Sequence, residues 1–360
     1  MKNSPSPCRA RDLGITPGIL PTGVNNTITD VAGVTVGNFT LVQDDDIRTG
    51  ATAILPHPGN IFQDKVPAGL VVGNGYGKLM GATQVVELGE IETPVLLTNT
   101  LAVPRAADAI LDWTLSQPGN ENCQSVNPFV GETNDGFLNN IRKRVLTPMQ
   151  FLTAINNAKA GYVEEGSIGA GTGTVAFGWK GGIGSSSRKL PESLGGFNLG
   201  VLVQTNFGGI LQIDGKKVGL SLGQYYLKEA LNDQSADGSI MIVIATDAPL
   251  SDRNLTRLAR RSFAGLARTG ASLTDGSGDY SLAFSTAPEV RRTPARRRQV
   301  HSFPEVPNSG MSPLFQAVIE ATEEAILNSL FMSTSMNGFQ GTIQGLPLER
   351  VRNLLEQKDQ

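Results

Sequence analysis

Two serines stand beside glycines at the start of apolar runs, where a hydroxyl can act as a nucleophile. Ser239 follows Asp237-Gly238 and opens the run 240–245, and Ser277 lies in Gly276-Ser277-Gly278-Asp279 before a second such run. A hydroxyl and a carboxylate two residues apart project from the same face of a strand. A Gly-Ser pair alone most often marks a turn before a strand. The Ser277–Asp279 motif nearby favours catalysis.

Two more polar groups lie where strands are expected to end. Asn206 closes the strand-like run 199–205 and precedes Phe207-Gly208. Glu132 and Asn134 lie in the polar stretch 131–135, which is expected to be a loop. An amide is a candidate oxyanion donor, and a carboxylate can bind an ammonium group. The alternatives are an Asx turn for Asn206 and a helix-capping loop for residues 133–135.

Histidine is scarce, which limits the bases available to a serine nucleophile. His57 and His301 are the two histidines, and both lie in turn-like or loop-like sequence. We therefore interpret them as surface histidines and disfavour a Ser-His-Asp triad. An N-terminal α-amine, with a pKa near ~7.7–8, can replace histidine as the base. Cleavage between Gly238 and Ser239 would create that amine, and a glycine tolerates the strained backbone of an N→O acyl shift.

Three motifs that could indicate a cofactor or metal site lack the required spacing or structural context. The stretch 169–173 runs into strand-like residues instead of a helix, and 73–78 has the wrong spacing for a phosphate loop. Their glycines are better explained by close backbone packing around a pocket. Asp44-Asp45-Asp46 lacks the spacing of an oxygen cage, and the two cysteines are too few for a metal cluster. We expect neither a cofactor nor a metal.

The elements that position these residues alternate between short apolar strands and amphipathic helices. Several strands are apolar throughout, which indicates sheets covered on both faces by helices. Thr147-Pro148 and Ser312-Pro313 have the residue types of helix N-caps followed by a first helical proline. The predicted strands span 33–37, 51–55, 66–73, 95–97, 199–205, 239–246 and 279–285, and the predicted helices 81–88, 103–115, 148–160, 252–269, 313–333 and 348–355.

Composition limits the partners. The net charge is −3, so no general basic field attracts nucleic acid or an anionic membrane. The five arginines of 291–298 lack interleaved aromatic residues, so a solvated or subunit-contact loop is favoured over nucleic-acid binding. We find no apolar run long enough to cross a bilayer, and we expect no secretory signal, because residues 1–15 carry charges and prolines and no apolar core. We expect a cytoplasmic protein.

Taken together, the motifs resemble the self-processing serine aminopeptidases that include L-aminopeptidase/D-esterase-amidase and the β-peptidyl aminopeptidases. The resemblance runs from Ile15-Thr16-Pro17-Gly18 to the helix after Ser312. The most specific stretches are 130–135, 181–188, 237–239 with 245–249, and 276–280. The resemblance implies an α/β (α+β) fold, a four-layer αββα sandwich like that of N-terminal-nucleophile hydrolases. It also implies a single domain, 1–360, cleaved into 1–238 and 239–360, and a homo-oligomer, such as a tetramer, of these pairs.

By the same resemblance, Ser239 is the nucleophile, Ser277 and Asp279 orient it, and Asn206 is an oxyanion donor. Glu132 anchors the substrate ammonium, with Asn134 beside it. The substrate would be a peptide or an aminoacyl amide or ester. Relatives use a tyrosine in the oxyanion region, whereas the corresponding position here is Phe137, which has no hydroxyl. Two alternatives stay open: a non-catalytic ligand-binding protein of the same fold, and an acyltransferase related to ornithine acetyltransferase, which typically uses a threonine nucleophile.

Overall fold

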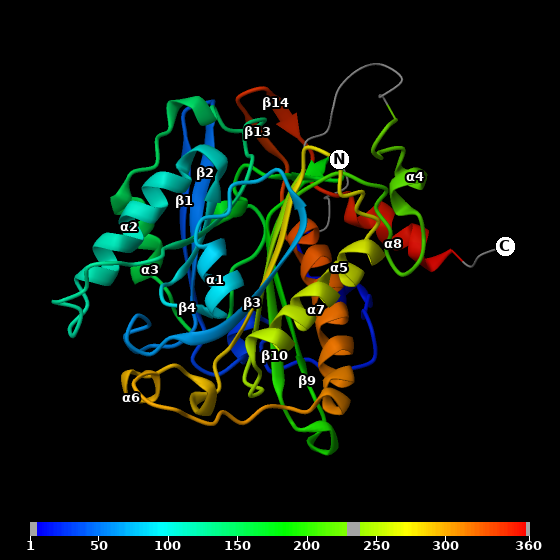
Figure 1. Ribbon diagram of the computed structural model, residues 1–360. Helices are drawn as coiled ribbons and strands as arrows, with labels where there is room; N and C mark the ends of the chain where they lie inside the picture. Colours follow the sequence, from blue (N-terminus) through cyan, green and yellow to red (C-terminus); the bar gives the residue numbers. More distant parts are fainter. Residues whose placement is uncertain (1–5, 229–237, 358–360) are drawn as a thin grey trace.

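The computed structural model describes residues 6–228 and 238–357, which form two β-sheets packed between helices (Figure 1). The first sheet has the strand order β1-β2-β5-β6, with the bounds β1 (Thr35–Gln43), β2 (Ile47–Leu55), β5 (Val95–Asn99) and β6 (Phe129–Thr133). Its neighbours are antiparallel except β5 and β6, which are parallel.

The second sheet contains most of the strands expected from the sequence and has the order β4-β3-β12-β11-β10-β9. The central pair β11–β12 is parallel, and every other neighbouring pair is antiparallel. The bounds are β3 (Val66–Gly75), β4 (Glu90–Ile91), β9 (Ile183–Lys189), β10 (Asn198–Asn206), β11 (Ser239–Thr246) and β12 (Gly278–Ser285). Two short hairpins, β7 (Val175–Ala176) with β8 (Trp179–Lys180) and β13 (Met336–Gly338) with β14 (Gly341–Ile343), stand apart from both sheets.

The helices cover the outer faces and complete the expected αββα sandwich. Helices α2 (Val103–Leu115) and α3 (Pro148–Asn156) pack on the first sheet, and α5 (Asp252–Arg268) and α7 (Met311–Phe331) pack on the second. Thr147 caps α3 as predicted, although that helix ends at Asn156 instead of near residue 160. The expectation that Ser312 caps α7 is wrong, because that helix begins at Met311 with Gly310 as its N-cap. The remaining helices are α1 (Ala82–Leu88), α4 (Val218–Leu222), α6 (Pro294–Arg297) and α8 (Leu348–Glu356).

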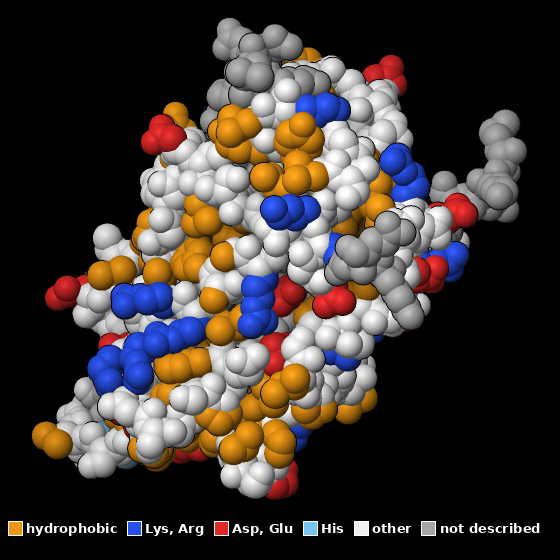
Figure 2. Space-filling view, turned by 90° about the vertical axis from the view of Figure 1, so that its right-hand side faces the viewer, with side chains coloured by type: hydrophobic (Ala, Val, Ile, Leu, Met, Phe, Trp, Pro, Cys, Tyr) orange, Lys and Arg blue, Asp and Glu red, His pale blue; other side chains and the backbone are white. Residues whose placement is uncertain are grey.

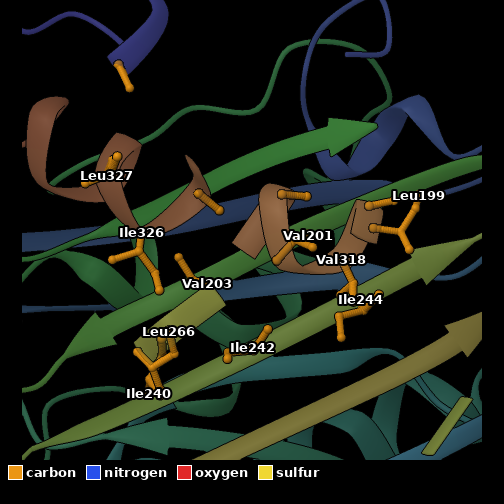
Figure 3. Packing of buried hydrophobic residues seen from close by; sticks show 14 of the residues in the cluster. Leu199, Val201, Val203, Ile240, Ile242, Ile244, Leu266, Val318, Ile326 and Leu327 are labelled. Carbon is orange, nitrogen blue, oxygen red and sulfur yellow. The ribbon is translucent and has the colours of Figure 1, made fainter. Parts of the chain in front are cut away.

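Strand β11 is apolar throughout because both of its faces are buried. Ile240, Ile242 and Ile244 face α5 and α7, whereas the residues between them face the first sheet (Figure 3). This alternation follows from the two-residue period of a strand. A third apolar cluster lies between the first sheet and helices α2 and α3. The three clusters fill the three spaces between four layers, which confirms the predicted architecture.

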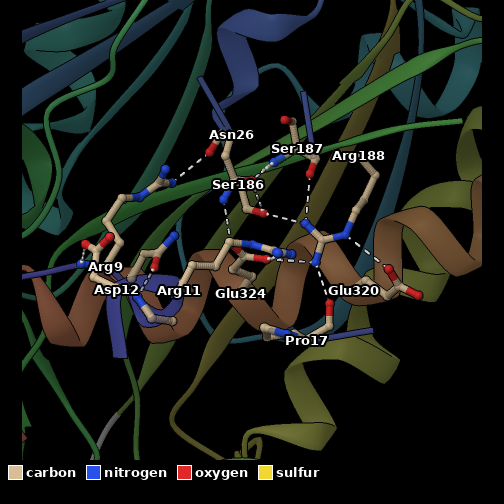
Figure 4. A network of polar contacts seen from close by, with 12 residues as sticks. Arg9, Arg11, Asp12, Pro17, Asn26, Ser186, Ser187, Arg188, Glu320 and Glu324 are labelled. Carbon is tan, nitrogen blue, oxygen red and sulfur yellow. Dashed lines mark hydrogen bonds and ion pairs between the residues drawn. The ribbon is translucent and has the colours of Figure 1, made fainter. Parts of the chain in front are cut away.

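A buried ionic network ties the N-terminal segment and β9 to α7 (Figure 4). Arg188 on β9 lies 3.1 Å from Glu320 and 2.8 Å from Glu324, and all three side chains are fully buried. Glu324 also accepts hydrogen bonds from Arg11 at 2.7 Å and from Asn26 at 2.5 Å. Buried charges are tolerated when they are paired and hydrogen-bonded in this way. The network joins side chains from both sides of the Gly238–Ser239 bond.

Basic side chains are concentrated on one part of the face drawn in Figure 2 and are scattered elsewhere on it. Figure 2 shows Lys and Arg side chains gathered toward the lower left of that face, with apolar side chains among them. Several of the arginines between β12 and α7 have local partners: Arg291 pairs with Asp64 at 3.2 Å, and the guanidinium of Arg292 lies over the Phe303 ring. Within the described residues, no helix is long and apolar enough to cross a membrane.

Candidate active site

The predicted site residues lie at or beside the ends of β6 and β10 and the starts of β11 and β12. Ser239 opens β11 and pairs with Asn206, the last residue of β10, on one side and with Gly278, the first residue of β12, on the other. Five of the predicted residues line one small cavity of about 40 Å³: Glu132, Asn134, Asn206, Gly238 and Ser239. Asp237 of the same motif lies outside the described residues.

Ser239 lies against the backbone of Gly278. The Gly278 N–H donates to the Ser239 Oγ and to the carbonyl oxygen of Gly238, each at 3.2 Å. The Ser239 side chain is nearly buried, with 6% of its residue surface exposed. A serine hydroxyl and the carbonyl of the preceding peptide bond therefore share one hydrogen-bond donor.

Close packing gives Gly238 a further reason to be a glycine, beside the strain tolerance expected for an acyl shift. Its φ angle is not in the left-handed region. An added Cβ would lie 2.8 Å from the Cα of Phe207, closer than non-bonded carbon atoms approach. Close approach to the end of β10 therefore excludes any side chain at this position.

Ser277 and Asp279 form the pair that their spacing predicts. The Ser277 Oγ donates to Asp279 Oδ1 at 2.6 Å, and both residues are buried. Burial raises the pKa of the Asp279 carboxyl to about 6, against the lowering effect of hydrogen bonds from Ser277 and the Ile240 backbone. The second oxygen, Oδ2, is buried without a hydrogen-bond partner among the described residues. A carboxylate with a raised pKa and a vacant acceptor site can accept a proton near neutral pH.

Asn206 is held by a distant backbone group. Its Oδ1 accepts a hydrogen bond at 2.9 Å from the N–H of Val175, which is 31 positions away in sequence. The alternative of a local Asx turn is therefore wrong, because such a turn bonds the backbone two residues further on. Because a backbone N–H can only donate, the Asn206 atom that it contacts must be the amide oxygen. The Nδ2 group of Asn206 is therefore the one available to donate a hydrogen bond. Asn206 lines the same cavity as Ser239.

Glu132 lies in a strand, so its assignment to a loop was wrong. It belongs to β6, and 2% of the residue surface is exposed. Its Oε1 accepts the backbone N–H of Lys78 at 2.8 Å, and its Oε2 accepts the Thr100 hydroxyl. Burial raises the pKa of the Glu132 carboxyl, while these hydrogen bonds and the Lys78 charge act in the opposite direction. Each oxygen keeps acceptor capacity for a cation in the cavity.

The neighbours of Glu132 differ in their roles. Asn134 lines the cavity and accepts the Gly136 backbone N–H at 2.8 Å, which closes a local turn. Phe137 is 41% exposed and is not among the described residues lining the cavity. Asp135 is buried three residues after Glu132 and hydrogen-bonds Asn139 at 2.9 Å.

Five further lining residues were not predicted as site residues: Tyr76, Gly77, Lys78, Thr100 and Gly276. The signal for the first three was the glycine-rich stretch 73–78, whose glycines were attributed to packing around a pocket. That interpretation is confirmed at Gly77, where an added Cβ would lie 2.7 Å from the Tyr280 ring and 3.1 Å from Glu132 Oε1. Thr100 carried no signal, because its proximity depends on the parallel pairing of β5 with β6.

The histidines play no part in this cavity. His57 was expected on the surface but is 1% exposed, and its Nε2 lies 2.7 Å from the Asp64 carbonyl oxygen. Burial lowers the pKa of the His57 imidazole. Neither histidine is among the described residues that line the cavity. In the described part of the chain, no group of three or more His, Cys, Asp or Glu side chains is placed to hold a metal ion.

Comparisons with known proteins agree with this fold. The model of peptidase family S58 matches residues 26–344. A β-peptidyl aminopeptidase of Sphingosinicella microcystinivorans is 39% identical, covering 97% of this chain and 92% of the relative. Among solved structures, the PH0078 protein of Pyrococcus horikoshii OT3 is 43% identical with a TM-score of 0.88, covering 96% of this chain and 98% of that one. The L-aminopeptidase D-Ala-esterase/amidase of Ochrobactrum anthropi, described as a variant of the Ntn-hydrolase fold, is 34% identical with a TM-score of 0.88, covering 96% and 98%.

The four-layer fold, with a serine opening a central strand, therefore defines a hydrolase of the N-terminal-nucleophile type. The chain belongs to peptidase family S58 and is a serine-type aminopeptidase. This assignment removes the reason for considering a non-catalytic ligand-binding protein or an acyltransferase.

Proposed function

We propose that the chain cleaves itself between Gly238 and Ser239 and then removes N-terminal residues with Ser239 as nucleophile. The supporting observation is the Gly278 N–H, which lies 3.2 Å from both the Gly238 carbonyl oxygen and the Ser239 Oγ. A donor on the carbonyl oxygen stabilises the negative charge that develops there during attack.

Self-cleavage follows from an N→O acyl shift. The Ser239 Oγ attacks the Gly238 carbonyl carbon, and its proton passes through the Ser277–Asp279 pair to the departing Ser239 nitrogen. Water then hydrolyses the resulting ester, which leaves a Gly238 carboxylate and a free Ser239 α-amine. The raised pKa of Asp279, about 6, suits a group that accepts a proton and returns it. The products are 1–238 and 239–360.

In turnover the new α-amine serves as the base that histidine supplies in other serine hydrolases. Ser239 attacks the substrate carbonyl, the amine or alcohol leaves with the transferred proton, and water releases the acyl group. Asn206 Nδ2 donates to the oxyanion, a contribution worth roughly 3–4 kcal/mol per donor in other hydrolases. Phe137 has no hydroxyl and is not among the described residues that line the cavity, so we assign the oxyanion role to Asn206 and backbone N–H groups.

The substrate is a peptide, amide or ester with a free N-terminal amine. Glu132 is the acceptor for that ammonium, because it is a buried carboxylate in the cavity with unused acceptor capacity. Asn134 lines the same cavity and is its proposed neighbour at the substrate. β-Amino acid substrates are included, since the Sphingosinicella relative is named a β-peptidyl aminopeptidase.

The proposal also includes the oligomeric assembly of the protein and its location in the cell. Val72 on β3 and Val86 and Leu88 on α1 are 53%, 71% and 61% exposed, and the two elements contact one another. Contact between subunits would cover these apolar side chains. We propose a homo-oligomer of processed pairs, to be checked by light scattering, in which Val86→Asp lowers the mass. We also propose a cytoplasmic location, with which the free thiols of Cys8 and Cys123 are compatible.

A denaturing gel with N-terminal sequencing tests the proposal. The mature wild type should give two bands, and the smaller should begin Ser239-Ile240-Met241. Ser239→Ala should give one uncut, inactive chain, whereas Ser221→Ala on the exposed face of α4 should be cut and active. Release of aniline from aminoacyl anilides measures peptidase activity. An active enzyme that runs as one intact band would contradict self-cleavage, and a folded chain without anilide hydrolysis would contradict the peptidase role.

A further inference from the structure

Lys180 is a buried cation that the proposed chemistry does not use. It is 0% exposed, and its Nζ donates to the carbonyl oxygens of Gly171 at 2.9 Å and Gly181 at 2.8 Å. Burial lowers the pKa of the Lys180 ammonium to about 7, against the opposing charge of Asp135. Burying an ammonium group is expensive, so its retention calls for a role that an apolar side chain cannot fill.

The two carbonyls belong to the segment that holds Asn206. Residues 171–175 lead into β7, and Val175 pairs with Lys180 across the β7–β8 hairpin. The same Val175 donates its N–H to Asn206 Oδ1 at 2.9 Å. Thr174 closes the turn, because its Oγ1 donates to the Gly171 carbonyl at 3.1 Å and its own carbonyl accepts the Gly181 N–H at 3.0 Å. The Lys180 ammonium therefore holds the first residue of the 171–175 loop directly. It also holds Gly181, whose N–H donates to Thr174, the neighbour of the Val175 that orients the Asn206 amide.

The loop also packs against the first sheet beside Glu132. An added Cβ at Gly173 would lie 2.9 Å from the Cβ of Asp135, so the loop backbone lies close to this side chain. Burial raises the pKa of Asp135 to about 7, and the charge of Glu132 adds to that rise. The Lys180 ammonium also interacts with the charge of Asp135, which follows the strand that carries Glu132.

We infer that Lys180 is a positioning residue for the Asn206 oxyanion donor, acting through the 171–175 loop and the Val175 N–H. The inference rests on the proposed role of Asn206. A purely structural lysine would affect folding stability. A positioning lysine affects the step in which negative charge develops on the oxyanion, and therefore kcat more than KM.

The test is a double-mutant cycle in the full chain. Lys180→Met keeps a long unbranched side chain and removes the ammonium. It should lower kcat per cleaved chain by roughly tenfold to a hundredfold, the scale expected when a catalytic group is misplaced by about 1 Å, with KM unchanged. In an Asn206→Ala background, the same substitution should cause no further loss, because the donor that it positions is already absent.

Lys65→Met is the matched control. Lys65 forms ion pairs with Glu90 and Glu92 just before β3, at the opposite end of that strand from the site, so kcat should stay at the wild-type value. If Lys180→Met does not fold, Thr174→Val replaces it in the double-mutant cycle. Thr174→Val removes one hydrogen bond of the loop, so kcat should fall roughly twofold to tenfold.

An unchanged kcat in Lys180→Met, or an equal loss in both backgrounds, would overturn the inference. If Asn206→Ala itself leaves kcat unchanged, the proposed oxyanion role fails instead, so the two failures are distinguishable.

Discussion

Replacing Glu132 by glutamine tests whether the enzyme recognises a free N-terminus. The variant keeps the shape of the side chain and can still accept the Lys78 N–H, but it has no charge to pair with an ammonium group. A charge-assisted hydrogen bond contributes roughly 1.5–3 kcal/mol. At about 1.4 kcal/mol per factor of ten, kcat/KM toward free-amine substrates should fall about ten- to a hundredfold. Self-cleavage involves no ammonium substrate and should persist.

The assay compares free and N-acetylated aminoacyl anilides on wild type and Glu132→Gln. The wild type should strongly prefer the free amine, and the variant should lose that preference. Because burial raises the pKa of Glu132, the anchor is neutralised as the pH falls through that raised value, so KM should rise on the acid side in the wild type only.

The raised pKa of Glu132 also distinguishes a role in binding the substrate ammonium from a purely structural role. A carboxyl whose folded pKa lies above its unfolded value costs stability when it is ionised, so Glu132→Gln should melt at the wild-type temperature or higher at pH 7. A structural role predicts a lower melting temperature and unchanged selectivity. Equal cleavage of both anilides by the wild type would refute the anchor.

Three further predictions follow from contacts described above. Asn206→Ala should lower kcat by roughly 10²–10³ in steady-state assays, and a wild-type kcat would contradict the oxyanion role. Asp279 has a pKa raised to about 6, so wild-type activity should fall as the pH drops through that value, whereas the free energy of unfolding should rise from about pH 6 toward 4. Asp279→Asn should remain uncut and inactive on a denaturing gel and in the anilide assay, and its melting profile should lack that rise. Arg188→Met leaves Glu320 and Glu324 short of a partner and should cost about 3–5 kcal/mol in urea unfolding, with kcat of the folded enzyme retained.

The sequence predicted those parts of the fold that local patterns determine. Strand β11 and helix α2 were predicted with their observed bounds, because an apolar run and a helical spacing are local signals. Strand β9 was missed, since Ser185, Ser186 and Ser187 are polar residues buried by hydrogen bonds to distant partners. Such burial depends on tertiary contacts that no local pattern encodes.

The site was predictable to a similar extent. The Ser277–Asp279 contact follows from a two-residue spacing, and the structure bears it out. The strand position of Glu132 was not recoverable, because residues 131–135 are polar and their strand forms by pairing with β5. Lys180 gave no signal either, because a lysine in sequence is ordinarily exposed.

The strand order of the second sheet has a consequence for how the protein folds and matures. Strands β3, β4, β9 and β10 precede the proposed cut, and β11 and β12 follow it, yet the later pair lies between the earlier ones. The chain must therefore complete its fold before it is cut, because residues 239–360 alone would present two unpaired strand edges. After the cut, unfolding separates two polypeptides whose reunion is bimolecular and competes with aggregation. If the proposed cut occurs, the lifetime of the mature enzyme is therefore set by its rate of unfolding and not by refolding equilibrium.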